Sequence, residues 1–180
     1  MTDPADLRPS QATGPEMVIQ QAEIACPEFN RFLYTAVGGN WYWTFWLGRT
    51  YQQWMDFLNR PEVETWVGYV QGTPAGYFEL EKQPEANVEI VHFGLLPRFI
   101  GQGLGGRLLT RAIQRAWEMG ARRVWVHTCT LDGPAALSNY QARGLRLYKQ
   151  EVREEEIPDQ PPGPWPGACA VSPEPSTASA

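Results

Sequence analysis

The chain has few cysteines, no excess of basic residues and no long apolar run. Its three cysteines, Cys26, Cys129 and Cys169, stand far apart and contain no CxxC pair, so we predict neither a disulfide framework nor a metal site. No apolar run approaches the roughly 18 residues of a membrane span. The first residues, MTDPADLRPS, lack the basic and then apolar order of a signal peptide. We therefore expect a soluble protein of the reducing cytoplasm.

Basic residues are outnumbered, because 15 lysines and arginines stand against 20 aspartates and glutamates and give a formal net charge of -5. The sequence-independent affinity of proteins for nucleic acids and anionic membranes comes from an excess of lysine and arginine. We therefore expect neither a nucleic acid nor a membrane as partner. The length of 180 residues corresponds to a single domain, and the hydrophobic content of 43% suits a packed globule.

The stretch from Val88 to Arg107, VEIVHFGLLPRFIGQGLGGR, holds the clearest local signal. An apolar run rich in β-branched and aromatic residues predicts a buried strand that ends at Pro97. Glycines follow at positions 101, 103, 105 and 106, and the apolar residues of LLTRAIQRAWEMG then recur with helical spacing. Glycines at the start of a helix leave its backbone N–H groups accessible, and the helix dipole adds positive potential there. The pattern predicts a phosphate or pyrophosphate site with Arg107 beside it; the alternative is a loop that merely needs glycines.

Periodicity places further elements along the chain. We predict strands over residues 17–24, 65–71, 75–82, 88–96, 122–130 and 145–152. We predict helices over residues 27–37, 51–58 and 104–119, and a short one from near residue 132 to residue 144. The domain is thus expected over residues 17–152, between a flexible lead-in (1–16) and a disordered tail (153–180) rich in proline and serine.

Residues 40–47, NWYWTFWL, hold five aromatic side chains in a segment that connects two predicted helices. Connections normally lie at the surface, so these side chains are not all expected in the core. Two interpretations remain open. Either Trp41, Trp43 and Trp46 line a pocket and bind the substrate, or they form a small satellite core under the sheet.

The glycine-rich stretch resembles a signature of the GNAT superfamily of acyl-CoA-dependent N-acyltransferases. The family's pattern is Gln/Arg-x-x-Gly-x-Gly/Ala, and here it falls on Ile100-Gly101-Gln102-Gly103-Leu104-Gly105. Ile100 departs from the pattern. The family uses this position chiefly through its backbone amide, so the resemblance still implies a pyrophosphate site here.

A second similarity lies near the end of the domain, where Ala136, Tyr140 and Gly144 match the family's Ala-x-x-x-Tyr-x-x-x-Gly. Gly133 stands where the family has an asparagine, three residues before the alanine. Together with the order of the predicted elements, the resemblance covers about residues 17–152. It implies a single GNAT-like domain of mixed α/β class, with a central sheet of about six to seven strands flanked by about four helices.

The resemblance implies an acetyltransferase that takes acetyl-CoA as its cosubstrate and needs no metal. The implied acceptor is the primary amine of a small molecule, which attacks directly in a ternary complex, and a homodimer is a possible assembly. The residues carried over as cofactor-binding are Phe93, Gly94, Leu95, Ile100, Gly101, Gln102, Gly103, Leu104, Gly105, Gly106 and Arg107.

Acetyl transfer to an amine requires a base, because an amine attacks only when neutral and a lysine-like amine has a pKa of about 10.4. Glu89 lies eleven residues before Ile100, at the spacing where several members of the family place their catalytic glutamate. It could equally be a surface carboxylate of the strand. His92 is a rival base, since histidine ordinarily titrates near neutrality, although on a regular strand it faces away from Glu89.

Two further roles follow from the resemblance. The strand backbone around Phe93 to Leu95 would donate hydrogen bonds to the developing oxyanion. Tyr140 would give a proton to the departing CoA thiolate. The alternative for Tyr140 is a helix tyrosine that packs on the sheet.

Two other classes of function fit parts of the sequence. Gly101-x-Gly103-x-x-Gly106 also matches a dinucleotide-binding fingerprint. That fold needs an acidic residue about 20 residues further on, and the only candidate, Asp132, lies 26 residues past Gly106. The other alternative is a non-catalytic CoA-binding or interaction module whose aromatic segment holds a partner.

Overall fold

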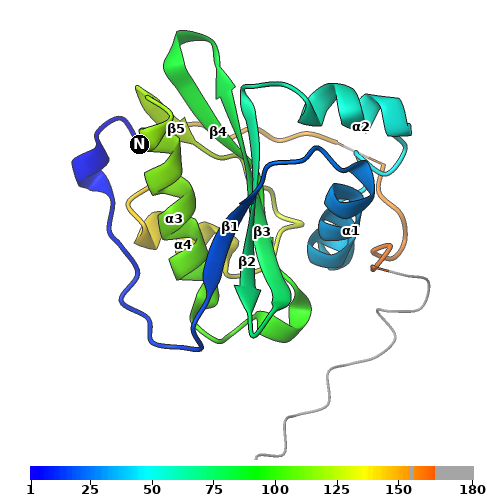
Figure 1. The fold of residues 1–180 in the computed structure, drawn as a ribbon, viewed down its shortest axis with the longest axis horizontal. Helices are drawn as coiled ribbons and strands as arrows, with labels where there is room; N and C mark the ends of the chain where they lie inside the picture. The colour runs from blue at the N-terminus through cyan, green and yellow to red at the C-terminus, as the bar shows by residue number, and fades with distance from the viewer. Residues whose placement is uncertain (155, 165–180) are drawn as a thin grey trace, which may run out of the picture.

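A single mixed sheet lies between two pairs of helices in the computed structural model, which describes residues 1–154 and 156–164. The strands follow the order β1 (Val18–Ala22), β2 (Val63–Val70), β3 (Thr73–Gln83), β4 (Asn87–Leu95) and β5 (Arg123–Trp125). β1 to β4 pair antiparallel, and β5 pairs parallel to β4. Helices α3 (Leu104–Glu118) and α4 (Ala136–Ala142) lie on one side of the sheet, and α1 (Pro27–Gly38) and α2 (Tyr51–Leu58) lie on the other (Figure 1).

Alternation along β3 and β4 gives each face of the sheet its own core. The main core lies between the sheet and α3, and its central strand residues are Phe78, Leu80, Val88 and Ile90. Its buried residues on α3 are Leu104, Leu108, Leu109, Ala112, Ile113 and Ala116. On the other face, Val67 and Tyr77 pack against Leu33 and Val37 of α1. The sheet is therefore covered on both sides.

Over residues 1–154 and 156–164, the mixed α/β class and the four α-helices agree with the prediction, but the sheet has five strands instead of about six to seven. Residues 145–152 are described, and none of them lies in a strand. The terminal ammonium of Met1 donates to the carbonyl oxygen of Val124 at 2.8 Å, and the N–H of Val124 donates to the carbonyl oxygen of Met1 at 2.9 Å. Met1 therefore occupies the outer edge of β5 at the position where a sixth strand would have to pair.

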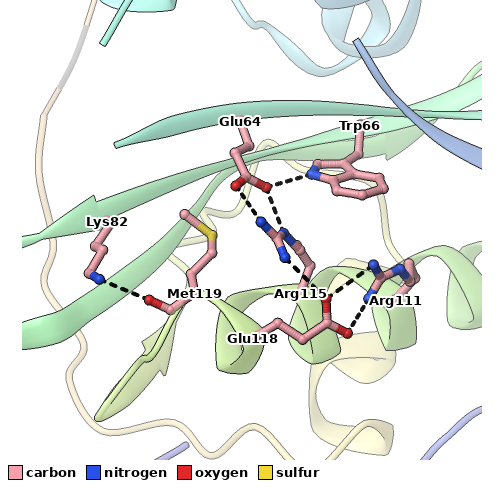
Figure 2. Close-up of polar contacts among 7 residues, drawn as sticks. All are labelled: Glu64, Trp66, Lys82, Arg111, Arg115, Glu118 and Met119. Atoms are coloured by element: carbon pink, nitrogen blue, oxygen red, sulfur yellow. Dashed lines mark hydrogen bonds and ion pairs between the residues drawn. The ribbon is translucent and has the colours of Figure 1, made fainter. Parts of the chain in front are cut away.

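Ion pairs join α3 to the strand beneath it (Figure 2). Arg115 of α3 donates from Nε and Nη2 to the two carboxylate oxygens of Glu64 on β2, at 2.8 and 2.7 Å. Trp66 Nε1 donates to the same carboxylate at 2.8 Å. Glu118 accepts from both Arg111 and Arg115 and so connects the exposed side of α3 to this pair. Charged hydrogen bonds, in addition to apolar packing, thus fix α3 on the sheet.

The C-terminal end of α3 is also held in place. Lys82 of β3 donates from Nζ to the carbonyl oxygen of Met119 at 2.9 Å (Figure 2). A cation at the end of a helix is stabilised by the helix dipole. Gly120 then takes the left-handed conformation, with φ 81°, which ends the helix. The contacts of Arg115 and Met119 therefore fix the last turn of α3 on the sheet.

The Glu64 pair makes a testable contribution to stability. Burial alone would raise the pKa of Glu64, but hydrogen bonds from Arg115 and Trp66 outweigh it and leave the pKa lowered. A carboxylate with a lowered pKa stabilises the fold above its unfolded pKa of about 4.3, and this contribution disappears as the pH falls through the folded-state pKa. Glu64→Gln should therefore lower the free energy of unfolding by about 1 to 3 kcal/mol at pH 7, and the difference from wild type should shrink below about pH 4.

Urea unfolding at pH 7 and pH 3 measures this difference. Glu118→Gln is the matched control, because the Glu118 side chain is 49% exposed whereas that of Glu64 is 13% exposed. Exposed ion pairs contribute about 0 to 1 kcal/mol. Equal losses for the two variants would show that burial of the Glu64 pair has no special effect.

Candidate active site

The glycine-rich turn joins β4 to α3 in a conformation that glycine favours. Gly101 (φ 84°) and Gly103 (φ 75°) take the left-handed conformation, and Gly103 is the N-cap of α3. No described side chain accepts a hydrogen bond from the N–H groups in the first turn of this helix, so no side-chain cap competes with a ligand for them. Ile100 is 47% exposed. Its side chain is therefore not needed in the core, and the position can act through its backbone.

The N-terminal segment, which the sequence predicts as a flexible lead-in, runs along the outer side of α3 (Figure 1). Arg107 Nη1 donates to the carbonyl oxygen of Pro15 at 2.7 Å. A Cβ atom added at Gly103 would lie 3.0 Å from Ala12 Cβ. Residues 12–15 thus lie directly against the turn, and the Arg107 side chain is held by this segment.

β4 and β5 separate at Glu89, well before β4 reaches the glycine-rich turn. Their parallel pairing joins Asn87–Glu89 to Arg123–Trp125, while β4 continues to Leu95. In the part of the chain that the structure describes, no strand pairs with this edge of β4 beyond Glu89. Backbone groups on an unpaired strand edge are available to a ligand. The predicted oxyanion donors, Phe93 to Leu95, lie in this part of β4.

The register between β3 and β4 shifts by one residue at Val91. His92 pairs with Glu79, and Glu89 pairs with Glu81. Since Glu79 and Glu81 are two residues apart on β3, they and their partners point to the same face. The expectation that His92 faces away from Glu89 applies only to a regular strand. The bulge brings both side chains to the α1 side of the sheet.

Glu89 is a buried carboxylate with two hydrogen-bond donors. Gln83 donates from Nε2 at 2.6 Å, and His127 donates from Nδ1 at 3.0 Å. Trp125 Nε1 in turn donates to Gln83 Oε1 at 3.1 Å and so orients the amide. The hydrogen bond to Glu89 raises the pKa of His127 and outweighs the opposing effect of burial. Glu89 is thus fixed at the point where β5 leaves β4.

His92 is buried between a carboxylate and a group of aromatic rings. Its Nδ1 is hydrogen-bonded to Oε2 of Glu79, whose side chain is fully buried. The rings of Tyr34, Trp43 and Trp46 lie around the imidazole, with centroids at 5.1, 5.4 and 5.3 Å. The position and orientation of the ring are therefore closely constrained.

Trp46 belongs to a satellite core, which is one of the two interpretations that the sequence leaves open. It is buried with Tyr34 and Trp54. The backbone N–H of Trp46 donates to the Tyr34 hydroxyl at 3.3 Å, and burial raises the pKa of Tyr34 to about 12. Trp46 therefore reaches the candidate site only through its contact with His92.

Trp43 packs against the same satellite core, and it and Trp41 also reach the loop that follows β5. Trp43 Nε1 donates to Asp132 Oδ1 at 3.4 Å, and its ring also contacts His92. A Cβ atom added at Gly133 would lie 3.3 Å from the Trp41 ring. Trp43 thus connects the α1 face of β4 with the loop beyond β5, and Trp41 packs on the same loop.

Tyr140 of α4 lies on the edge of the same gap. It is buried, and its ring centroid is 5.9 Å from that of Phe93. Burial, followed by the negative charge of Asp132, raises the pKa of Tyr140 well above its usual value. The phenol therefore keeps its proton at neutral pH. It packs on β4, and it holds a proton beside the predicted oxyanion donors.

Sequence reasoning missed the buried cluster of Asn30, Thr65 and Glu79, and it missed the two partners of Glu89, which are Gln83 and His127. The three residues of the cluster are buried and hydrogen-bonded to one another. Alternation along β3 places Glu79 on the same inward face as Tyr77, and this could have revealed it. Asn30 and Thr65 carry no local signal, because their partner Glu79 lies 49 and 14 residues away in the sequence.

Residues 1–154 and 156–164 contain no group of three or more His, Cys, Asp or Glu arranged to hold a metal ion. Within these same ranges, no helix is both long and apolar enough to cross a membrane. Cys26 and Cys129 are free thiols, and Cys169 lies outside the described residues. Most of the predicted tail, residues 153–180, also lies outside them, but the N–H of Gly163 donates to the carbonyl oxygen of Gly39 at 2.9 Å.

A family model described as the acetyltransferase (GNAT) family matches residues 26–145. The chain belongs to the GNAT family of acetyltransferases. A search of curated protein sequences gives no match. The match to the family model spans all of the site residues described above, from Asn30 to Tyr140.

Solved structures of acetyltransferases are similar to this GNAT domain. An aminoglycoside acetyltransferase, meta-AAC0020, from an uncultured soil metagenomic sample is 18% identical, with a TM-score of 0.61 over 78% of this chain and 95% of its own. AAC(6')-Iy in complex with a CoA bisubstrate analogue is 17% identical, with a TM-score of 0.59 over 78% of this chain and 98% of its own. IAA acetyltransferase from Bacillus cereus is 21% identical, with a TM-score of 0.57 over 74% of this chain and 79% of its own. At these identities the likeness establishes the fold.

The hydrogen bond between Glu89 and His127 can be tested directly. Since Glu89 raises the pKa of His127, a pH titration of the His127 ring by NMR should give a value above the usual one of about 6.5. Glu89→Gln should lower that value towards the usual one. Asp132→Asn is the matched control, because Asp132 affects His127 only through its charge at a distance and less strongly. An unchanged His127 titration in Glu89→Gln would contradict the ion pair.

Proposed function

We propose that this GNAT domain transfers an acetyl group from acetyl-CoA to the primary amine of a small molecule, by direct attack in a ternary complex. The supporting observation is the left-handed glycine turn at the N-terminus of α3, next to an unpaired edge of β4. Two buried proton acceptors, Glu89 and His92, lie on the same face of that strand. Binding, activation of the amine and protonation of the leaving group thus have candidate residues around one gap.

The residues of the turn fit the cofactor that the family uses. Free N–H groups at a helix N-terminus bind phosphate oxygens, and the backbone of Ile100 to Gly105 would hold the pyrophosphate. The N–H groups of Phe93 to Leu95 would bind the oxygen on which negative charge develops. When bound, acetyl-CoA supplies the acetyl group as a thioester.

The remaining steps move protons between side chains of the site. Glu89 or His92 would accept a proton from the amine, because only the neutral amine attacks. The Tyr140 hydroxyl would give a proton to the departing sulfur. The place of Tyr140 supports this role, because its ring packs 5.9 Å from that of Phe93, beside the strand edge where the thioester would lie.

The acceptor class is proposed from two observations. Trp41 and Trp43 at the gap suit an apolar part of an acceptor, and two of the similar solved structures are aminoglycoside acetyltransferases. The deciding experiment incubates the protein and acetyl-CoA with amino acids, polyamines, aminoglycosides, arylamines and peptides. Release of free CoA thiol is measured and the acetylated product is identified by mass spectrometry. If no amine accelerates thiol release, the proposed activity is wrong.

Cofactor binding should depend on the size of residue 105. A Cβ atom at Gly105 would lie 3.6 Å from Leu95 Cδ1 and 3.7 Å from Asn139 Nδ2, which is ordinary contact. Gly105→Ala should therefore bind acetyl-CoA like wild type. In Gly105→Val the larger side chain should narrow the gap and weaken binding by about tenfold or more, which corresponds to about 1.4 kcal/mol.

Calorimetric titration with acetyl-CoA measures both affinities, and thermal unfolding of both variants confirms that they are folded. Gly103 is a poorer position for this test, since its φ of 75° and its contact with Ala12 mean that any side chain disturbs the fold itself. Equal affinity of the Gly105→Val variant and wild type would show that the phosphate site is misplaced.

Tyr140→Phe should lower kcat by about tenfold or more while the dissociation constant of acetyl-CoA stays nearly unchanged. The reason is that the hydroxyl acts only when the sulfur leaves, whereas the ring keeps its packing on Phe93. Tyr148→Phe is the matched control, since that side chain is exposed. A parallel loss of affinity would make Tyr140 a packing residue. Unchanged turnover would leave the protonation of the sulfur to solvent.

A further inference from the structure

Four polar side chains from four different elements meet in the interior of the domain. Asn30 comes from α1, Thr65 from β2, Glu79 from β3 and His92 from β4. Glu79 is 0% exposed and His92 is 7% exposed. Burial of a carboxylate costs several kcal/mol unless partners compensate for the lost water. Packing alone would be served better by apolar side chains, so the cluster needs an explanation.

The two carboxylate oxygens of Glu79 have different hydrogen-bond partners. Oε1 accepts from Asn30 Nδ2 at 2.7 Å and from Thr65 Oγ1 at 3.1 Å, and Asn30 Nδ2 also donates to Thr65 Oγ1 at 2.8 Å. Oε2 is left for Nδ1 of His92. An ionised carboxylate has no proton to donate, so Nδ1 must donate. A neutral imidazole that carries its proton on Nδ1 has its lone pair on Nε2.

Among the described residues, Glu79 is the charged group that contacts His92 directly. Tyr34 and Tyr77 face the ring, and burial raises the pKa of both, so they stay neutral. The guanidinium carbon of Arg49 lies 3.6 Å from the centre of the Trp46 ring. Asp132 is hydrogen-bonded to Trp43, which lies between it and His92. Glu89 points to the same face but is hydrogen-bonded to Gln83 and His127. The hydrogen bond and ion pair of His92 with Glu79 use Nδ1, so neither of them occupies Nε2.

On the basis of the proposed acetyl transfer, we propose that His92 is the base and that Glu79 is the residue that positions it. Glu79 holds the proton on Nδ1, and Asn30 and Thr65 fix the carboxylate. A proton of the acceptor amine moves to Nε2 as the N–C bond forms and the C–S bond breaks. The departing sulfur takes a proton from the Tyr140 hydroxyl. The imidazolium of His92 then releases its proton to solvent, and solvent returns one to Tyr140. Glu89 serves instead to anchor His127 at the edge of the gap.

The first experiment needs neither acceptor nor activity. NMR of the wild-type protein labelled with ¹⁵N at histidine reports which ring nitrogen of His92 carries the proton when the ring is neutral. We expect the proton on Nδ1, with Nε2 as the nitrogen that titrates. A neutral ring protonated on Nε2 would overturn the proposal, because the nitrogen that is free to act would then have no lone pair.

The second experiment measures the pH dependence of kcat/KM, with acetyl-CoA and whichever amine of the panel reacts fastest. Glu79→Gln removes the charge that stabilises the imidazolium, so the low-pH limb should move to lower pH and the maximal rate should fall at least about tenfold. Glu81→Gln is the matched control, because Glu81 lies two residues from Glu79 on the same strand but forms its ion pair with Arg60 and not with His92. Its low-pH limb should stay close to that of wild type.

Substitution of the two candidate bases completes the test. His92→Gln should remove the low-pH limb of the kcat/KM profile, and Glu89→Gln should retain it. Loss of the limb in Glu89→Gln, with an unmoved limb in Glu79→Gln, would assign the base to Glu89 and overturn this proposal while leaving acetyl transfer intact. A wild-type protein that acetylates no amine would overturn the proposed function, and the role of His92 as base would fall with it.

Discussion

A single extra residue in β4 determines how the candidate site is arranged. Without the bulge at Val91, Glu89 and His92 would point to opposite faces of the sheet, and His92 could not lie opposite Glu79. With it, both side chains lie on the α1 side, close to the edge of β4 that β5 leaves unpaired. Bulges are common beside active sites because they redirect a side chain without ending the strand. The chemistry proposed for the domain depends on this one irregularity.

The aromatic segment between α1 and α2 supports the site from two sides. Trp46 packs into the satellite core and contacts the His92 ring edge to face. Trp43 contacts His92 and donates a hydrogen bond to Asp132. The departures from the GNAT pattern also have physical reasons. Trp41 lies so close to Gly133 that a side chain at 133 would have little room. The exposed side chain of Ile100 leaves the backbone of the turn free to act.

Features that depend on neighbours in the sequence could be predicted. Three helices follow from the 3.6-residue period of apolar residues, and α4 follows from the helix-start signals at Asp132 and Pro134. The hairpin of β2 and β3 follows from alternation about the short turn at Gly72. The strand, turn and helix around Gly101 and Gly103 also follow, because left-handed backbone is a property of single residues. The family followed in turn from the spacing of these local signals and was confirmed by the family match.

Features that depend on long-range pairing were decided only in the tertiary structure. Residues 145–152 have the composition of a strand, but Met1 occupies the edge of β5. Glu79 has the identity of a surface residue, yet it is fully buried, because partners from α1, β2 and β4 converge on it. Alternation predicts that His92 and Glu89 diverge, and the register with β3 brings them together. Periodicity in a sequence indicates which face a residue prefers, whereas strand register, edge occupancy and hydrogen-bond partners are set by residues far away along the chain.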